Sequence, residues 1–387
     1  MAGKSILVSK SISRNVQLKR FLRSLASKDK KKSQRRCHAQ HNVESNDLSK
    51  FAVQSVPGLP KNDGYQNILV PAVLDMTQED DETLALVRDI RKLVLGRNKP
   101  VRLVFDVAED IKPDSLLILL AEIHRCRLIH GDSMLTGTYP KKGSKLEKIF
   151  HSTGFFKLLG VKSRILRGPK RFPVDYVKFI SDIRPPKDLS KQFRKALFGE
   201  EIEVELNIRR QLVRAIGEAV VNVGQHAYPK YSRHDHPCKG RWWLSGHVNK
   251  EKMLLTIMFC DLGVGIPETL PNRYPMEIIW SVLSALTGTK LNDGQMIKAG
   301  MEIGRSQTYQ SHRGKGLNDL RRIIDTAGEG ELHIYSRKGC YRYSPDKADE
   351  VRNLKNSVGG TLIKWTIPLN KVTNWAGETA DDENQKN

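Results

Sequence analysis

The stretch QLVRAIGEAVVNVGQHAY, residues Gln211–Tyr228, decides how the rest of this 387-residue chain is interpreted. Apolar residues recur in it at helical spacing, which predicts an amphipathic helix with one face buried. Glu218, Asn222 and His226 follow one another every four residues, so each step advances only about 40° around the helix axis. The predicted helix therefore carries a carboxylate, an amide and an imidazole in one row.

This polar row can be interpreted in two ways. A carboxylate can orient or deprotonate a nucleophile, an amide oxygen can hold a hard cation such as Mg²⁺, and an imidazole can reach a phosphate. The same spacing also occurs on the solvated face of an ordinary helix. The segments that follow in the chain favour the chemical interpretation.

A second motif follows a buried strand, which the apolar run Leu254–Cys260 predicts. Asp261 stands at the end of that strand, and Gly263 and Gly265 come next. A carboxylate in this position can accept a hydrogen bond from the exocyclic amine of adenine, and glycines beside it let the backbone pass close to a flat base. The pattern by itself is a common turn after a strand.

A third motif is suited to phosphate. Gly314, Lys315 and Gly316 open a predicted helix, and the free N–H groups and positive dipole end of a helix attract phosphate oxygens. Arg313 and Lys315 add positive charge. The spacing does not match the Walker pattern G-x-x-x-x-G-K-[ST].

The fourth motif, Gly359-Gly360-Thr361, begins a strand predicted over Leu362–Ile367. A threonine hydroxyl at a strand start can close a hydrogen-bond network beneath a ligand. In this order, the four motifs resemble the nucleotide-binding segments of the GHKL ATPases, a family that includes DNA gyrase B, heat-shock chaperones, histidine kinases and MutL. The resemblance covers nearly half of the chain.

The resemblance to GHKL ATPases implies ATP and Mg²⁺ as cofactors and a role for each matching residue. Glu218 would orient or activate the attacking group, Asn222 would hold the Mg²⁺ ion, and His226 would lie near the phosphates. Asp261 would bind the adenine amine. The remaining residues expected around ATP are Gly263, Gly265, Arg313, Gly314, Lys315, Gly316 and Thr361.

The same resemblance implies an α/β (α+β) fold, a two-layer GHKL (Bergerat) sandwich in which a mixed sheet lies under three main helices. The long segment between Gly265 and Arg313 corresponds to the ATP lid of the family. We expect it to be a polar, glycine-containing loop that becomes ordered when a γ-phosphate arrives. Ser306, Gln307 and Thr308, near its end, are expected close to the nucleotide.

Upstream of this half, strands and helices alternate, which predicts a smaller α/β unit. A strand over Val101–Asp106, followed by Asp114 and Ser115 at the start of a helix over Leu116–Cys126, resembles a STAS-like domain. In that family a serine at this helix start is phosphorylated, which makes Ser115 a possible phosphosite; a plain helix N-cap is the alternative. The other elements predicted here are a strand at Ile68–Val70, a helix at Thr83–Leu95 and a helix–strand stretch at Phe155–Val161.

Composition divides the chain into five parts. They are a basic, partly disordered arm over 1–60, the STAS-like domain over 64–166, a linker over 167–190, the GHKL domain over 191–370 and a disordered acidic tail over 371–387. The five cysteines are scattered and lack C-x-x-C spacing, which argues against a disulfide framework or a zinc site and for a reducing compartment. No run approaches the roughly 18 apolar residues of a membrane-spanning helix.

The chain carries a net charge of +22, and residues 1–50 contribute 13 basic against 3 acidic residues. So basic an arm attracts polyanions such as nucleic acid, an acidic protein surface or anionic lipid, although it can also be a solvated tail. Residues 1–28 contain no acid and superficially suit a mitochondrial transit peptide. The reducing compartment indicated by the cysteines leads us to expect a cytoplasmic protein. An organellar protein is the alternative if the basic N-terminus is a transit peptide.

The leading hypothesis is an ATP-binding regulatory protein that uses slow hydrolysis, or phosphotransfer to a protein serine, to switch a protein partner. A histidine kinase is disfavoured, because no recognisable dimerisation helix with a phosphoacceptor histidine precedes the four motifs. One alternative is a nucleic-acid-associated ATPase that binds the phosphate backbone through its basic arm and forms a homodimer when ATP binds. The other is a catalytically inactive nucleotide sensor.

Overall fold

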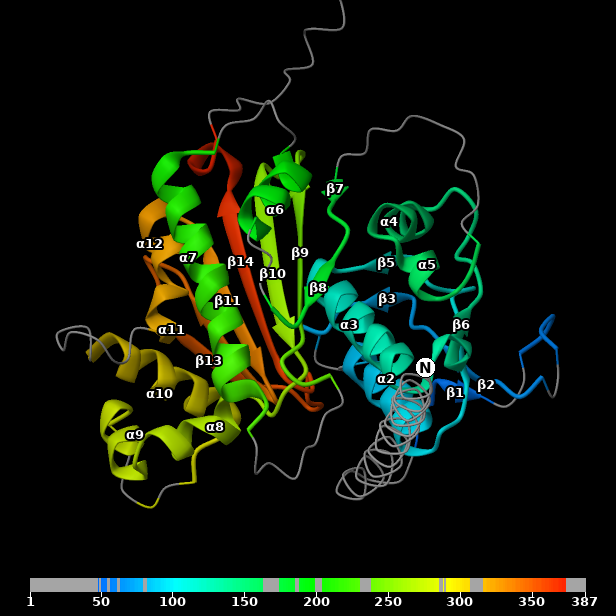
Figure 1. Ribbon diagram of the computed structural model, residues 1–387, viewed down its shortest axis with the longest axis horizontal. Coiled ribbons are helices and arrows are strands. Elements are labelled where there is room, and N and C mark those ends of the chain that lie inside the picture. The colour runs from blue at the N-terminus through cyan, green and yellow to red at the C-terminus, as the bar shows by residue number, and fades with distance from the viewer. Residues whose placement is uncertain are drawn as a thin grey trace, which may run out of the picture.

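The structure, a computed structural model, describes residues 48–373 apart from several short segments. Within that range the segments not described are 49, 54–55, 61–62, 79–81, 163–173, 185–187, 199–203, 230–237, 285–287, 289 and 307–315. Two units lie side by side in Figure 1, and we call residues 48–162 the N-terminal unit and residues 174–373 the C-terminal unit. No helix in the described ranges is long and apolar enough to cross a bilayer.

In the C-terminal unit the described residues form an eight-stranded sheet. The strand order is β13-β12-β11-β14-β10-β9-β7, and β8 also pairs with β9. Each of these strand pairs is antiparallel. The strands are β7 (Val174–Tyr176), β8 (Ile180–Asp182), β9 (Trp242–Asn249), β10 (Leu254–Asp261), β11 (Glu331–Ser336), β12 (Gly339–Tyr343), β13 (Glu350–Asn353) and β14 (Thr361–Pro368).

The mixed sheet expected from the GHKL resemblance is therefore wrong for this chain. Short connections join β9 to β10 and β11 to β12, and strands joined in this way pair antiparallel. β14 then enters between β10 and β11 and runs antiparallel to both. Parallel pairing occurs instead in the N-terminal unit.

Helices cover one face of this sheet. α7 (Leu206–Asn222) continues into a π-helical turn, η4 (Val223–Ala227), and runs along the sheet beside α6 and α12 in Figure 1. Leu212 and Ile216 of α7 pack with Trp365 of β14 in one buried core, as the apolar period of this helix predicts. The other helical elements of this unit are α6 (Leu189–Phe198), α8 (Ile266–Arg273), α9 (Met276–Val282), α10 (Asp293–Ser306), α11 (Gly316–Asp319), α12 (Arg322–Ala327) and η6 (Leu369–Lys371).

The N-terminal unit is an α/β layer whose described strands form a four-stranded sheet in the order β1-β2-β4-β6. β2, β4 and β6 are parallel, because α2 and α3 provide the crossovers, and β1 pairs antiparallel with β2. β3 and β5 form a separate parallel pair. The elements are β1 (Ala52–Val53), β2 (Gln66–Leu69), β3 (Val73–Leu74), α2 (Glu82–Arg91), η2 (Lys92–Gly96), β4 (Val101–Val104), β5 (Asp110–Ile111), α3 (Pro113–His130), η3 (Asp132–Met134), β6 (Leu135–Gly137), α4 (Lys145–Thr153) and α5 (Phe155–Leu158).

Several expected boundaries change. β1 begins at Ala52, inside the segment expected to be a basic arm, while residues 1–47 lie outside the described residues. The expected linker 167–190 contains β7 and β8, whose main-chain groups pair with the edge strand β9, so this connection extends the sheet. The helix–strand stretch expected at Phe155–Val161 contains α5 and no described strand. Residues 374–387 of the expected tail lie outside the described residues.

The N-terminal unit covers the second face of the large sheet. α3 lies against β9, β10 and β14. Trp243, Cys260, Leu262 and Leu362 of the C-terminal unit belong to the same buried apolar cluster as the core of the N-terminal unit. Trp243 also donates a hydrogen bond from Nε1 to Nδ1 of His124 on α3, at 3.0 Å. The expected two-layer sandwich is thus extended by a third layer, so the large sheet is buried on both faces.

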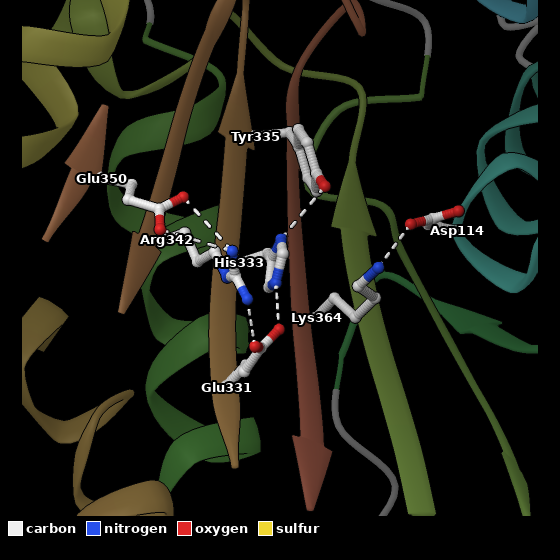
Figure 2. A network of polar contacts seen from close by, with 7 residues as sticks. All are labelled: Asp114, Glu331, His333, Tyr335, Arg342, Glu350 and Lys364. Atoms are coloured by element: carbon white, nitrogen blue, oxygen red, sulfur yellow. Dashed lines mark hydrogen bonds and ion pairs between the residues drawn. The ribbon is translucent and has the colours of Figure 1, made fainter. Parts of the chain in front are cut away.

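Polar side chains occupy the rest of this second face, as Figure 2 shows. Those on β11, β12 and β13 are joined by hydrogen bonds and ion pairs: Glu331, His333, Tyr335, Arg342 and Glu350. Lys364 of β14 crosses the boundary between the units and pairs with Asp114 of α3 at 2.7 Å. Burial acts to raise the pKa of Asp114, but the Lys364 ammonium and the main-chain N–H of Ser115 together outweigh it and leave the pKa below its ordinary value.

Asp114 and Ser115 lie in the first turn of α3. The helix begins at Pro113, and its N-cap residue, Lys112, makes no side-chain capping hydrogen bond. Ser115 has no exposed surface, and its Oγ accepts a hydrogen bond from the main-chain N–H of Met76 at 2.9 Å. The N-cap interpretation of Ser115 is therefore wrong, because the hydroxyl ties the helix to an earlier segment. Phosphorylation of Ser115 stays a prediction and requires this buried turn to open.

A buried charge cluster joins α2 to α3. Glu122 of α3 is fully buried and pairs with Arg125 at 2.6 Å and with Arg91 of α2 at 3.0 Å. Burial alone would raise the pKa of Glu122, but the two guanidinium groups lower it to about 2. Arg91 also presses against Gly359, where an added Cβ would come within 2.1 Å of the arginine Nη2. The N-terminal unit therefore touches the glycine pair that leads into β14.

We expect Glu122→Gln to lower the free energy of unfolding by about 3–5 kcal/mol, because it leaves the buried Arg125 and the partly buried Arg91 without their carboxylate. Urea denaturation at pH 7 measures this change. Glu350→Gln is the matched control: Glu350 also pairs with an arginine, but its side chain is 61% exposed. We expect the control to change stability by no more than about 0.5 kcal/mol. Equal effects of the two substitutions would contradict a stabilising role for the buried cluster.

Candidate functional site

The C-terminal unit contains a pocket of about 790 Å³, including the space at its open mouth. Its lining comes from α7 and η4, from α8, α10 and α11, and from the ends of β10 and β14. The residues of the sequence motifs that line it are Asn222, His226, Asp261, Gly265 and Thr361. Residues of the first, second and fourth sequence motifs therefore line one cavity.

Asp261 is the last residue of β10 and is only 6% exposed. Its Oδ1 accepts a hydrogen bond from the N–H of Gly263 at 2.8 Å. Burial raises the pKa of Asp261 to about 7, although the main-chain N–H groups of Gly263 and Thr361 act in the opposite direction. Among the described residues, no lysine or arginine forms an ion pair with it. The pocket therefore contains a buried carboxyl group without a cationic partner among the described residues.

Glycines let main-chain segments touch beneath the pocket. A Cβ on Gly263 would lie 2.2 Å from the carbonyl oxygen of Ala227 in η4, and one on Gly360 would lie 2.1 Å from that of Asp261. Gly265 has φ +85°, which L side chains rarely adopt. Gly265 lines the pocket, whereas Gly263 acts below it by allowing β10 and η4 to approach each other.

Thr361 stands opposite Asp261 in the ladder between β10 and β14. The Thr361 hydroxyl is 2.9 Å from the hydroxyl of Ser336, and the Thr361 main-chain N–H acts on the carboxyl group of Asp261. Ser336 Oγ also accepts the N–H of Ile266 at 2.8 Å. Ser336, which sequence analysis missed, therefore fastens the start of α8 to the strands below the pocket.

The polar row of α7 reaches the pocket in part. Asn222 and His226 line it, whereas Glu218 is half-buried one turn earlier. Burial, and then the charge of Asp319, raise the pKa of Glu218, while Arg273 acts to lower it. The π-helical turn η4 begins directly after Asn222, and π-helical turns occur frequently at functional sites.

Asn222 carries a side-chain amide at the pocket. Its Nδ2 is buried without a hydrogen bond of good geometry within the described part of the chain, and the amide acts to lower the pKa of Glu218 one turn earlier. The described residues contain no group of three His, Cys, Asp or Glu side chains that could hold a metal ion. Asn222 offers one amide oxygen to this pocket, so an Mg²⁺ ion bound there would take its other ligands from phosphate oxygens and water.

The phosphate motif is described only at its end. Gly316 begins α11, which confirms that the motif opens a helix, and Leu317 of this helix lines the pocket. The helix ends at Asp319, and α12 begins separately at Arg322. The other three residues of this motif, Arg313, Gly314 and Lys315, lie outside the described residues.

The segment expected to be an irregular lid is mostly helical. It contains α8, α9 and α10, which share a buried apolar cluster of their own: Leu270, Ile279, Met296, Ala299 and Ile303. The expectation of a loop was wrong because Met296, Ala299 and Ile303 already have helical spacing, and this pattern outweighs the glycines between them. Ser306 ends α10, and Gln307 and Thr308 lie outside the described residues.

Arg273, at the end of α8, is a lining residue that sequence analysis missed. Its Nη1 lies 3.4 Å from Nε2 of His226. Burial, and secondarily the charge of Arg273, lower the pKa of His226, so the imidazole is neutral at pH 7. No motif marks Arg273 in the sequence, because its position in the pocket depends on how α8 packs against α10.

Comparison with protein-family models found no match to this chain. The curated proteins likewise gave no significant match. The function is therefore argued from the geometry and chemistry of the pocket.

The raised pKa of Asp261 predicts a pH dependence of stability. The folded protein keeps this proton up to about pH 7, whereas the unfolded chain loses it near the ordinary value of 3.8. The folded state therefore binds more protons between these values, so the contribution of Asp261 to the free energy of unfolding falls as the pH rises. At about 1.4 kcal/mol per pKa unit, the total fall is at most about 4 kcal/mol.

Urea unfolding of the parent protein and of Asp261→Asn at pH 4.5 and pH 8 measures this contribution. The variant has no proton to lose at this position, so it should gain stability relative to the parent as the pH rises. A difference between the two proteins that stays constant with pH would contradict a buried, titrating Asp261.

Proposed function

We propose that this pocket binds Mg-ATP and that the nucleotide state switches an interaction with a partner protein. The observation that carries the proposal is the meeting of Asn222, Asp261 and Thr361, which come from separate motifs, around one cavity. These residues are far apart in the sequence, and the resemblance to GHKL ATPases implies this grouping. We infer a GHKL-type ATPase domain over residues 191–370.

The chemistry of the Asp261 end suits adenine. A buried carboxylate without a cationic partner gains from a hydrogen-bond donor, and the exocyclic amine of adenine is one. Guanine carries a carbonyl oxygen at the same position, so two acceptors would face each other. Phe259 and Ile363 also line the pocket and offer apolar surface to a flat base. The expected preference is for ATP over GTP.

The Asn222 end suits phosphate and a metal ion. Asn222 would hold Mg²⁺ through its amide oxygen, and the bound ion would neutralise charge on the phosphate oxygens. His226 lies one turn further along the same helix and can donate a hydrogen bond to a phosphate oxygen. Leu317 of α11, the helix that the phosphate motif opens, lines the same pocket.

Glu218 favours an enzyme over a passive sensor. Its pKa is raised by burial and by Asp319, and a carboxylate with a raised pKa is a better general base near neutral pH. It could take a proton from water, giving hydrolysis, or from a serine hydroxyl, giving phosphotransfer. The N-terminal unit supports a regulatory role, because it packs against the strands that carry Asp261 and Thr361.

Isothermal titration calorimetry with Mg-ATP tests the proposed site. Asp261→Asn should weaken ATP binding about tenfold or more and reduce the preference for ATP over GTP, because an amide oxygen is an uncharged and weaker acceptor. Asn222→Ala should leave ATP binding without Mg²⁺ nearly unchanged and remove the increase in affinity that Mg²⁺ produces.

Glu350→Gln, on the other side of the large sheet, should bind nucleotide like the parent protein. Absence of any binding of Mg-ATP by the parent would refute the proposed function. Full Mg²⁺ dependence in Asn222→Ala would refute the metal assignment alone.

Turnover of Glu218→Ala separates the enzyme from the sensor. Loss of a general base lowers the rate about 10²–10⁴-fold. We therefore expect ATP hydrolysis or phosphotransfer to fall by at least a hundredfold while ATP affinity changes little. Release of phosphate and labelling of protein from γ-labelled ATP measure the two reactions. Nucleotide binding by the parent with no turnover of either kind would identify a sensor instead.

A further inference from the structure

We propose that Arg273 binds the terminal phosphates of the nucleotide, so that α8 distinguishes a triphosphate from a nucleoside. This inference rests on the proposed ATP site and adds to it a residue outside the four sequence motifs. Arg273 ends α8 and lines the same pocket as Asp261 and Asn222.

Arg273 differs from other arginines of the C-terminal unit that form ion pairs with carboxylates. Arg214 and Arg322 both pair with Asp319, at 2.9 and 3.1 Å, and Arg337 pairs with Glu268. Arg273 forms no ion pair within the described residues; its contacts are Nε2 of His226 at 3.4 Å and the ring of Tyr274, 5.4 Å from its guanidinium carbon. Of the described residues that line the pocket, Arg273 alone carries a permanent positive charge. A guanidinium in a pocket without its own anion is suited to bind one from a ligand.

The position of Arg273 matches the phosphate end of the proposed ligand. His226, which it contacts, lies one turn beyond Asn222, where the Mg²⁺ ligand is proposed. The charge of Arg273 also acts on Glu218, the proposed base, and opposes the rise of its pKa. Arg273 therefore contacts His226 and acts on Glu218, and it lines the same pocket as Asn222.

A phosphate at this position would also bridge two neighbouring side chains. Arg273 and His226 are close neighbours, and burial and the arginine charge together keep the imidazole neutral. A phosphate group between them would accept hydrogen bonds from both and would stabilise the protonated imidazole. The two side chains would then act as a cationic pair that forms only when the ligand carries phosphate.

Because one end of α8 is fixed, a contact between Arg273 and phosphate at the other end would change the position of this helix. The start of α8 is fixed, because Ser336 accepts the N–H of Ile266 and Arg337 pairs with Glu268. At the other end, the guanidinium group of Arg273 contacts Nε2 of His226 and the ring of Tyr274. Leu270 of α8 belongs to the cluster shared by α8, α9 and α10, so phosphate held by Arg273 would act on all three helices.

Calorimetric titrations of the full chain with Mg-ATP and with adenosine test the inference. Arg273→Ala should weaken ATP binding about 10- to 100-fold, as expected for the loss of a charge-assisted hydrogen bond, and change adenosine binding less than about twofold. Arg273→Lys should recover part of the ATP affinity, because it restores the charge without the bidentate geometry. Arg342→Ala is the matched control: Arg342 is an arginine on the opposite face of the sheet, paired with Glu331 and Glu350.

The outcomes separate this inference from the proposed function. If the parent binds both ligands and Arg273→Ala binds ATP as tightly as the parent, Arg273 does not contact phosphate and the ATP site stands. Equal weakening of ATP and adenosine would mean that Arg273 is merely structural, which also overturns the inference. If the parent binds neither ligand, both the proposed function and the inference about Arg273 are refuted.

Discussion

The paired ends of β10 and β14 are the constraint on which the rest of the structure depends. Asp261 and Thr361 face each other in this ladder and line the pocket, whereas Leu262 and Leu362, the next residues along, are buried in the core of the N-terminal unit. Side chains alternate between the two faces of a sheet, so one short stretch of strand serves two interfaces. A shift in register would disturb the pocket and the packing of the two units at once.

Contacts at the entry to β14 make the two units interdependent. Gly360 touches the carbonyl of Asp261 on one side, and Gly359 touches Arg91 on the other. Arg91 belongs to the buried cluster around Glu122, whose charges are compensated only while α2 and α3 keep their positions. The N-terminal unit therefore contacts the glycine pair that leads into the strand below the pocket.

The secondary structure could largely be predicted from the sequence where the hydrophobic period is strong. The helix at Gln211–Tyr228 and the buried strand at Leu254–Cys260 were predicted and are observed. The prediction of an irregular lid was wrong because the helical spacing of Met296 and Ile303 outweighs the glycines between them. These two residues are buried in a separate cluster, which stabilises α10. The prediction of a mixed sheet was wrong because it came from the resemblance to GHKL ATPases. The short connections between β9 and β10 and between β11 and β12 make these strands antiparallel.

The sequence by itself determined which residues could form a site, because local patterns placed Asn222, His226 and Asp261 on particular elements. Whether these residues meet was decided only by the tertiary structure, through the close approach of β10, η4 and β14 that the glycines allow. Arg273 and Ser336 follow no local pattern, since their roles arise from how α8 and β11 pack. The position of the N-terminal unit as a third layer was also beyond the sequence, because an apolar sheet face does not specify what will cover it.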